Sequence, residues 1–186
     1  LGCGSDPLVE RLRSAGIEVR CLGAMRRWDI SVVGRLVAEL KRVSPDVLQT
    51  WLFHANVAGG LASRRAGVGR LVTGIRVAER RGRWRLWLER ICTRRACRHV
   101  CVSREVAEFS VARGGLNRTK LEVIPNGVDV ASFADVQPMD LTGHGVPGVA
   151  RVVAWIGRLD HQKDPLAAVE AFGGLSSRFD DCHLVL

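Results

Sequence analysis

Tyrosine is absent from the sequence, and phenylalanine occurs only five times in 186 residues. Nucleic-acid-binding surfaces rely on aromatic side chains that stack on bases, and the chain shows no recognised nucleic-acid motif, so nucleic acid is not a predicted partner. No apolar run approaches the roughly 20 residues that a membrane-spanning helix needs. The first residues carry no basic segment followed by an apolar one, so no secretory signal is expected.

Cysteine occurs six times, but the paired short spacings of a zinc site are missing. Three cysteines and His99 do lie close together in the sequence. Cys101, however, falls in an apolar, strand-like run, while Cys92 and Cys97 fall on a predicted helix, so these side chains are not expected to converge. We therefore predict no metal site. Without a secretory signal, we expect reduced and mostly buried thiols.

Acidic residues are outnumbered, since 28 Lys and Arg residues face 19 Asp and Glu residues. The formal net charge is +9 and the pI is about 10.2. Such a charge favours an anionic partner, such as a phosphate group or an acidic membrane surface, and does not bear on the fold. The 47% hydrophobic and 25% charged content is typical of a globular protein.

The most informative stretch begins with the apolar run 152–156. The run has no polar alternation, which is typical of a strand buried on both faces of a parallel sheet. Asp164 suits a helix N-cap and Pro165 the first helical position, so a helix is predicted to follow. The loop between this strand and this helix contains Gly157, Arg158 and Lys163. Ligands of open α/β sheets bind beyond the carboxyl ends of the strands, so the two cations predict an anionic ligand there.

The rest of the chain alternates between strand and helix patterns. Helices are predicted at 7–16, 30–43, 61–66 and 104–112. Strands are predicted at 17–22, 47–51, 71–76, 99–102, 120–124 and 183–186. This alternation predicts an α/β protein with parallel, doubly wound sheets. Because the chain opens with leucine and stops within a strand-like run, we expect a fragment cut at both ends.

The segment from Arg76 to Arg98 holds nine arginines and two glutamates. Within it, four apolar side chains fall at helical spacing on one face: Trp84, Trp87, Leu88 and Ile91. One interpretation is a core-facing stripe on a helix with a solvated basic face. The other is a helix that contacts an anionic membrane surface.

Two motifs resemble a known family. The arrangement of Gly157, Arg158 and Lys163 after an apolar strand resembles the donor-phosphate loop of retaining glycosyltransferases of family 4, which have the GT-B fold. Residues 123–129, with Phe133 after them, resemble the family's segment between its two domains. The resemblance implies two Rossmann-like domains, both incomplete here: residues 1–134 on the acceptor side, a linker at 135–149, and the start of the nucleotide-sugar domain at 150–186.

Residues 52–56 resemble a further segment of the same family. His54 matches the later histidine of that segment, whereas Gln49 and Trp51 replace two earlier ones, one of which lies against the transferred sugar in several members. By position, His54 and Asn56 follow a predicted strand at its carboxyl end, where ligands bind. A structural hydrogen-bonding role for His54 is the alternative.

Asn126 and Gly127 form a turn signal after the strand at 120–124. Both residue types tolerate positive φ, which would let the backbone swing into the cleft between the domains. A tight turn without a functional role is the alternative.

The resemblance implies a glycosyltransferase that moves a sugar from a nucleotide-diphosphate donor to a hydroxyl acceptor, a glycan or lipid-linked sugar, with retention. The implied process is the synthesis of polysaccharide, lipopolysaccharide or glycolipid. His54, Arg158 and Lys163 would be catalytic, and the two cations would stabilise the diphosphate leaving group, so neither metal nor cofactor is expected. The expected location is the cytoplasm, with peripheral contact to the cytoplasmic membrane face.

The alternative is a basic, non-catalytic module that binds an anionic polymer or a membrane surface. The family's first-strand Gly-Gly loop and the Glu-x7-Glu segment that contacts donor sugar and ribose are both missing from the 186 residues. We therefore expect this fragment alone to be inactive.

Overall fold

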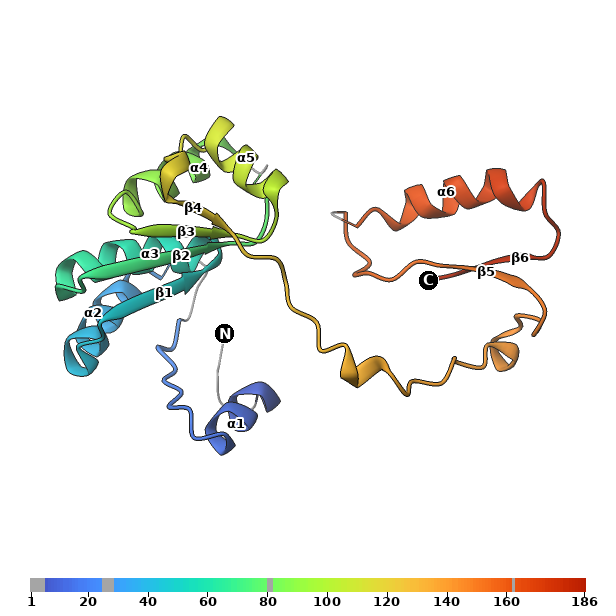
Figure 1. The fold of residues 1–186 in the computed structure, drawn as a ribbon, viewed down its shortest axis with the longest axis horizontal. Coiled ribbons are helices and arrows are strands. Elements are labelled where there is room, and N and C mark those ends of the chain that lie inside the picture. Colours follow the sequence, from blue (N-terminus) through green and yellow to red (C-terminus); the bar gives the residue numbers. More distant parts are fainter. Residues whose placement is uncertain (1–5, 25–28, 80–81, 162) are drawn as a thin grey trace. The chain divides into compact units, whose positions relative to one another are not determined.

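The structure is a computed structural model that describes residues 6–24, 29–79, 82–161 and 163–186. Contacts within the chain divide it into two compact units, Leu1–Gly127 and Val128–Leu186. Figure 1 shows the two units, each built around its own sheet, and they are described one at a time.

The first unit is built on a four-stranded parallel sheet with the strand order β1-β2-β3-β4. The strands are β1 (Val47–Trp51), β2 (Arg70–Ile75), β3 (Arg98–Cys101) and β4 (Leu121–Val123). They agree with the predicted strands except for small shifts at the ends. Because all four strands are parallel, their carboxyl ends meet at one edge of the sheet, which is the edge where ligands of such sheets bind.

Five α-helices accompany this sheet in the described chain: α1 (Pro7–Ser14), α2 (Ser31–Val43), α3 (Leu52–Ala66), α4 (Arg83–Cys92) and α5 (Arg104–Ala112). Helix α3 packs on β1 and β2, and both α2 and α4 pack on α3, while α5 packs on β3 and β4. A short 3-10 helix, Arg118–Lys120, precedes β4. A core cluster of Ile75, Cys101 and Val106 lies between the sheet and α5.

Helices α3 and α4 approach each other closely at a glycine. A Cβ atom added to Gly60 would lie 2.4 Å from the backbone oxygen of Cys92, the last residue of α4. Such a separation is far below van der Waals contact, and the atom in the way belongs to backbone that cannot rotate aside. Only glycine therefore fits at this position without a shift of one helix.

The predictions for residues 17–22 and for Cys21 were wrong. Residues 17–22 form no strand: the Ile17 amide donates to the Leu12 carbonyl, and Glu18 pairs with Arg20 at 2.6 Å. An alternating sequence becomes a strand only beside a pairing strand, and none of the described strands pairs with this segment. Cys21 is disulfide-bonded, so the expectation of reduced thiols fails there. The other described cysteines, Cys92, Cys97, Cys101 and Cys182, are free.

The second unit contains two parallel strands, β5 (Arg151–Ala154) and β6 (Cys182–Val185), joined through helix α6 (Pro165–Ser176). Strand β5 was predicted to be buried on both faces, and this was wrong: Val152 and Val153 are each about two-fifths exposed. Within the described residues, one helix and one neighbouring strand are too little to cover both faces of β5.

The division between the units falls after Gly127, whereas the sequence placed the end of the first domain at residue 134. The stretch after Gly127 bonds locally, because Asp129 Oδ1 accepts from the Ala131 amide at 3.2 Å and the Asp129 carbonyl from Ser132 Oγ at 2.7 Å. It therefore adds no strand to the first sheet. Residues 135–149 hold one short 3-10 helix, Thr142–His144, and their role as the linker stays a prediction.

None of the helices in the described ranges is both long enough and apolar enough to cross a membrane.

Candidate functional site

Strand β1 passes directly into helix α3 at the carboxyl edge of the first sheet. Trp51 is extended, and the next residue, Leu52, has a φ of 71°. A left-handed backbone is strained for leucine, and such strain persists only where the surroundings fix it, often at functional sites. The abrupt turn places His54 in the first helical turn with its side chain exposed. Its ring meets the Phe53 ring edge-on, with centroids 5.2 Å apart.

Asn56, the second residue predicted for the site from this segment, points inward and is fully buried. Its Oδ1 accepts a hydrogen bond from Thr50 Oγ1 at 2.7 Å. Its Nδ2 donates to the Gly74 carbonyl at 3.1 Å and to Glu89 Oε1 at 2.7 Å. All polar groups of the amide are thus engaged with protein. Asn56 therefore has a structural role behind the site and is not available to bind a ligand.

Behind Asn56 lies a group of charged side chains from α4 and the segment before it: Arg85 and Glu89, which are buried, and Glu79, which is half-buried. Arg85 Nε lies 2.8 Å from Glu79 Oε2, and the Arg85 guanidinium carbon lies 3.9 Å from the centroid of the Phe53 ring. Burial raises the pKa of the Glu89 carboxyl and the nearby Glu79 raises it further, whereas the hydrogen bond from Asn56 and the charge of Arg85 act in the opposite direction. The group therefore links α4 to the start of α3.

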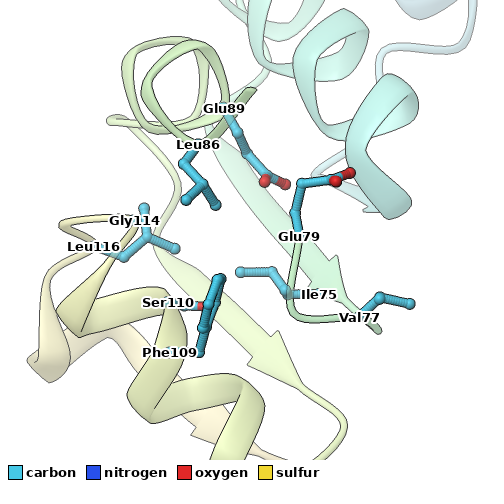
Figure 2. Close-up of a pocket in the computed structure, with 9 residues that line it drawn as sticks. All are labelled: Ile75, Val77, Glu79, Leu86, Glu89, Phe109, Ser110, Gly114 and Leu116. Carbon is cyan, nitrogen blue, oxygen red and sulfur yellow. The ribbon is translucent and has the colours of Figure 1, made fainter. Parts of the chain in front are cut away.

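A small pocket opens beside these carboxylates, between α4 and α5 (Figure 2). Its lining is mainly apolar and includes Ile75, Leu86, Phe109 and Leu116, while Glu79 and Glu89 lie along one side. The polar side chains of the lining have partners in the protein: Glu89 Oε1 accepts from Asn56, Glu79 Oε2 lies 2.8 Å from Arg85 Nε, and Ser110 Oγ donates to the Val106 carbonyl.

Two residues that the sequence analysis did not assign to the site stand at the same edge of the sheet. Arg76 follows β2 directly, and its guanidinium carbon lies 5.3 Å from the centroid of the Trp51 ring. Arg76 Nη2 also donates a hydrogen bond to Asn126 Oδ1. Side chains from the ends of β1, β2 and β4 therefore converge. Arg76 could have been found by the rule that singled out Arg158, namely a cation directly after a strand.

Gly74 makes this arrangement possible. A Cβ atom at Gly74 would lie 2.1 Å from Trp51 Cε3, so the Trp51 ring lies directly against the glycine. The two residues are register partners in neighbouring strands. Trp51 is nevertheless 45% exposed, which leaves part of the ring open to a ligand.

Gly157, Arg158 and Lys163 occupy one loop at the carboxyl end of β5, as predicted from the sequence. A Cβ at Gly157 would meet the Trp155 ring at 3.1 Å and Lys163 Cγ at 3.4 Å, so the loop is closely folded. Arg158 Nη2 lies 3.1 Å from Asp160 Oδ2, and the Arg158 side chain is 75% exposed. Both cations are accessible to an anion that approaches the end of the strand.

The helix after this loop begins as the sequence predicted. Asp164 is the N-cap, and its side chain accepts from the Ala167 amide at 3.3 Å. Pro165 is the first helical residue. Asp164 itself has a φ of 45°, so the backbone turns sharply between Lys163 and the helix.

Three of the four side chains in the apolar stripe of helix α4 are exposed, and the fourth, Leu88, is half-buried. Trp84 is 51% exposed, Trp87 is 61% exposed and Ile91 is 43% exposed, while Arg85 and Glu89 on the other face are buried. The interpretation of a core-facing stripe is therefore wrong. The buried polar pair finds partners in Asn56 and Glu79, which the spacing within α4 could not reveal.

In the described part of the chain, no three His, Cys, Asp or Glu side chains come close enough together to hold a metal ion. His99, near the cysteines noted in the sequence, is buried and hydrogen-bonded to Thr73 Oγ1 through Nδ1 at 2.7 Å. Burial and the nearby Lys120 lower the pKa of His99 to about 4. Burial likewise raises the pKa of the Cys101 thiol to about 11, so this thiol is not poised to react.

The structure thus forms two groups of predicted site residues. His54 and Asn126 lie at the carboxyl edge of the first sheet, joined there by Trp51 and Arg76, with Asn56 buried behind and Gly127 ending the unit. Gly157, Arg158 and Lys163 lie together in the second unit. Both groups stand where parallel strands end.

Comparison with known proteins relates this chain to sugar-transferring enzymes. UDP-Gal:alpha-D-GlcNAc-diphosphoundecaprenol alpha-1,3-galactosyltransferase of Escherichia coli is 27% identical over 177 residues, which cover 90% of this chain and 46% of that protein. Phosphatidyl-myo-inositol mannosyltransferase of Mycolicibacterium smegmatis is 41% identical over 64 residues, or 34% of this chain and 16% of that protein. The chain spans about half the length of the first of these relatives.

Among solved structures, Anabaena Alr3699/HepE in complex with UDP and glucose superposes with a TM-score of 0.74 at 19% identity. The superposition covers 94% of this chain and 49% of that one. It confirms the predicted fold, a GT-B-like α/β architecture of which part is present here. The model of Glycosyltransferase Family 4 matches residues 3–132, more than half of the chain. The chain therefore belongs to glycosyltransferase family 4.

Proposed function

We propose that the whole protein transfers a sugar from a nucleotide-diphosphate donor to a hydroxyl acceptor, with retention of configuration at the anomeric carbon. The observation that carries the proposal is the loop after β5, which presents two accessible cations at a strand end in a chain of this family. Membership of a transferase family also disfavours the alternative of a non-catalytic basic module.

The proposed donor is a UDP-sugar, because the similar Anabaena structure contains UDP and glucose. As the bond between sugar and diphosphate breaks, negative charge accumulates on the leaving phosphate. Arg158 and Lys163 are proposed to bind these oxygens, Arg158 through two parallel N–H groups and Lys163 as a point charge. Cations aimed at developing charge stabilise the transition state more than the ground state, so the loop can act without a metal.

The bound diphosphate is proposed to displace Asp160 from Arg158. The ion pair between Asp160 and Arg158 is largely exposed to solvent, and such pairs contribute little stability, so the exchange costs little. Until the donor arrives, Asp160 keeps the guanidinium beside the loop.

His54 is proposed to lie against the transferred sugar. It lies in the first turn of α3 with an exposed side chain, directly after the turn at Leu52. The proposed role is to position the sugar hydroxyls by hydrogen bonding, so that the acceptor meets the anomeric carbon on the correct face. His54 would then contribute to the rate more than to nucleotide affinity.

The proposed acceptor is a lipid-linked sugar, and the proposed process is the synthesis of glycolipid, lipopolysaccharide or a related polysaccharide. The support is the Escherichia coli relative, whose name gives a sugar on diphosphoundecaprenol as its acceptor. An enzyme with such an acceptor would work in the cytoplasm at the cytoplasmic face of the membrane.

Helix α4 supports peripheral contact with an anionic membrane. Its exposed tryptophans are amphipathic side chains that favour the boundary between lipid and water. The same segment carries exposed arginines: Arg83, Arg90, Arg94 and Arg95. Between residues 82 and 98 the single acidic residue is Glu89, which is buried, so this segment exposes basic side chains and no acidic one.

The donor assignment is tested by UDP binding to the full-length enzyme, measured by calorimetry. Arg158→Ala and Lys163→Ala should each weaken UDP binding about tenfold or more, as expected for the loss of a charge-assisted hydrogen bond. Arg178→Ala removes an exposed cation from the same unit and should leave the affinity unchanged. Unchanged affinity in both loop variants would refute the phosphate assignment.

A further inference from the structure

Arg76 is a cation whose position is fixed by its neighbours before any ligand binds. The Trp51 ring supports the guanidinium from one side, at 5.3 Å between the guanidinium carbon and the ring centroid, and Asn126 accepts a hydrogen bond from Nη2. None of the ion pairs found among the described residues involves Arg76. The side chain is partly exposed at the carboxyl edge of the first sheet.

Two further residues, Gly74 and Asn126, are needed for this arrangement of Arg76. Gly74 admits the Trp51 ring at a distance that no side chain would allow, and Asn126 comes from the end of β4, on the far side of β3. A solvated surface arginine needs none of these supports. An arginine held as a planar fork loses less freedom on binding, and this shape suits phosphate oxygens.

We propose that Arg76, supported by Trp51 and Asn126, binds a phosphoryl group of the acceptor substrate. This rests on the proposed function, in which the donor diphosphate is bound by Arg158 and Lys163 in the second unit and the first unit receives the acceptor. A second anion site in the first unit then serves the second phosphorylated substrate. The exposed part of the Trp51 ring gives the adjoining sugar an apolar face on which to stack.

The proposal is tested in the full-length enzyme with two acceptors, one with and one without a diphosphate: N-acetylglucosamine linked to a short isoprenyl diphosphate, and the same sugar linked directly to the same isoprenyl group. Arg76→Ala should raise KM for the diphosphate acceptor about tenfold or more and leave KM for the neutral acceptor and for the UDP-sugar unchanged. Arg76→Lys should recover part of the loss, because it restores the charge without the fork. Arg70→Ala, at the opposite end of β2, is the matched control and should change none of these values.

Three results would overturn the proposal: no change with either acceptor, an equal rise in KM for both acceptors, which would indicate a structural role, or a rise in KM for the donor alone, which would assign Arg76 to the donor phosphate. An inactive wild-type enzyme would instead count against the proposed function.

A binding measurement separates the two proposals when activity is lacking. Calorimetric titration with inorganic pyrophosphate, carried out in the Arg158→Ala/Lys163→Ala background, should detect a site whose affinity falls about tenfold or more when Arg76→Ala is added. No detectable binding, or binding that Arg76→Ala leaves unchanged, would overturn the assignment of Arg76 whatever the reaction proves to be.

Discussion

Asn56 Nδ2 donates a 2.7 Å hydrogen bond to Glu89 Oε1, and both side chains are buried. The bond joins the start of α3, which carries His54, to the middle of α4, which carries the exposed tryptophans. A hydrogen bond to a buried carboxyl is worth more than one between neutral groups, and leaving that carboxyl without a donor is costly. This amide is therefore one of the contacts that position α4 against α3.

Asn56→Ala should destabilise the protein by about 3 kcal/mol, because Glu89, the Gly74 carbonyl and the Thr50 hydroxyl all lose their partner. Urea unfolding followed by far-UV circular dichroism measures the change. Thr50→Val, which removes a single neutral bond from the same network, should cost about 1 kcal/mol and is the matched control. Equal decreases in the free energy of unfolding of the two variants would show that the bond to Glu89 contributes no more than a neutral hydrogen bond.

Asn56→Asp should give a stability that recovers as the pH falls. It places a second carboxyl beside Glu89, whose pKa is already raised by burial. Two adjacent carboxylates cannot both stay ionised in a buried site, so the folded state binds a proton more tightly than the unfolded state. Urea midpoints measured at several pH values should therefore approach those of the wild type in acid and fall away from them near neutrality. A deficit that is constant with pH would contradict this account.

His99 should make the protein less stable as the pH falls from about 6.5 to about 4. Its pKa is lowered from 6.5 to about 4, so the unfolded state takes up a proton in this window while the folded state does not. The contribution lost across the window is about 3 kcal/mol. His99→Gln should reduce the change of the urea midpoint with pH over this range. His144→Gln, at an exposed position, should leave the pH dependence unchanged. A His99→Gln profile as steep as that of the wild type would contradict the assignment.

His54→Ala should lower kcat of the full-length enzyme about a hundredfold, as losing a hydrogen bond to the reacting sugar does, with little change in UDP affinity. Single-turnover transfer from the UDP-sugar measures the rate, and calorimetry measures the affinity. His144→Ala serves as the control. A variant that keeps nearly the full rate removes His54 from the site.

Replacing Trp84 and Trp87 by serine should reduce binding to vesicles of phosphatidylglycerol about tenfold or more, because each indole leaves the lipid boundary. Co-sedimentation measures the bound fraction. Ile30→Ser, which changes an 84% exposed apolar residue elsewhere in the same unit, should have no effect. Binding should also weaken with added salt, since the arginines act through screened charges. Equal binding of the double variant and the wild type would exclude α4 as the contact.

The local elements were predictable because their signals are short-ranged. Strand β1 coincides with the predicted range 47–51, and the helix start at Asp164 and Pro165 follows from capping and a fixed φ. The loop of Gly157, Arg158 and Lys163 was found in the same way, since a strand and a helix enclose it within a few residues.

The helix predicted at 61–66 begins too late, because Gly59 and Gly60 were interpreted as part of a loop, whereas α3 begins at Leu52. Both residues lie within helix α3. Each must be a glycine because another atom occupies the space of a side chain: the Thr50 side chain lies against Gly59, and the Cys92 backbone lies against Gly60. A local pattern cannot distinguish a glycine that breaks a helix from one that lets two elements approach. With the helix start unknown, the inward direction of Asn56 could not be predicted either.

Which face of α4 is buried was left open by the sequence for a related reason. Its apolar stripe and its polar pair, Arg85 and Glu89, both have helical spacing, and an apolar stripe is the usual choice for the buried face. The polar pair is buried because partners come from distant segments, with Asn56 reaching Glu89 and Phe53 lying under Arg85. Only the tertiary fold brings these partners together.

The close approach of Gly60 to the Cys92 backbone has a consequence for how the enzyme would meet its substrate. With no side chain between them, the backbones of α3 and α4 are in direct contact at this point, and such close packing couples the position of one helix to that of the other. If the tryptophans of α4 rest on a bilayer, the same contact fixes the height and tilt at which His54 faces the membrane. Gly60, although far from any reacting atom, would then help to set the height above the membrane at which a lipid-linked sugar is bound.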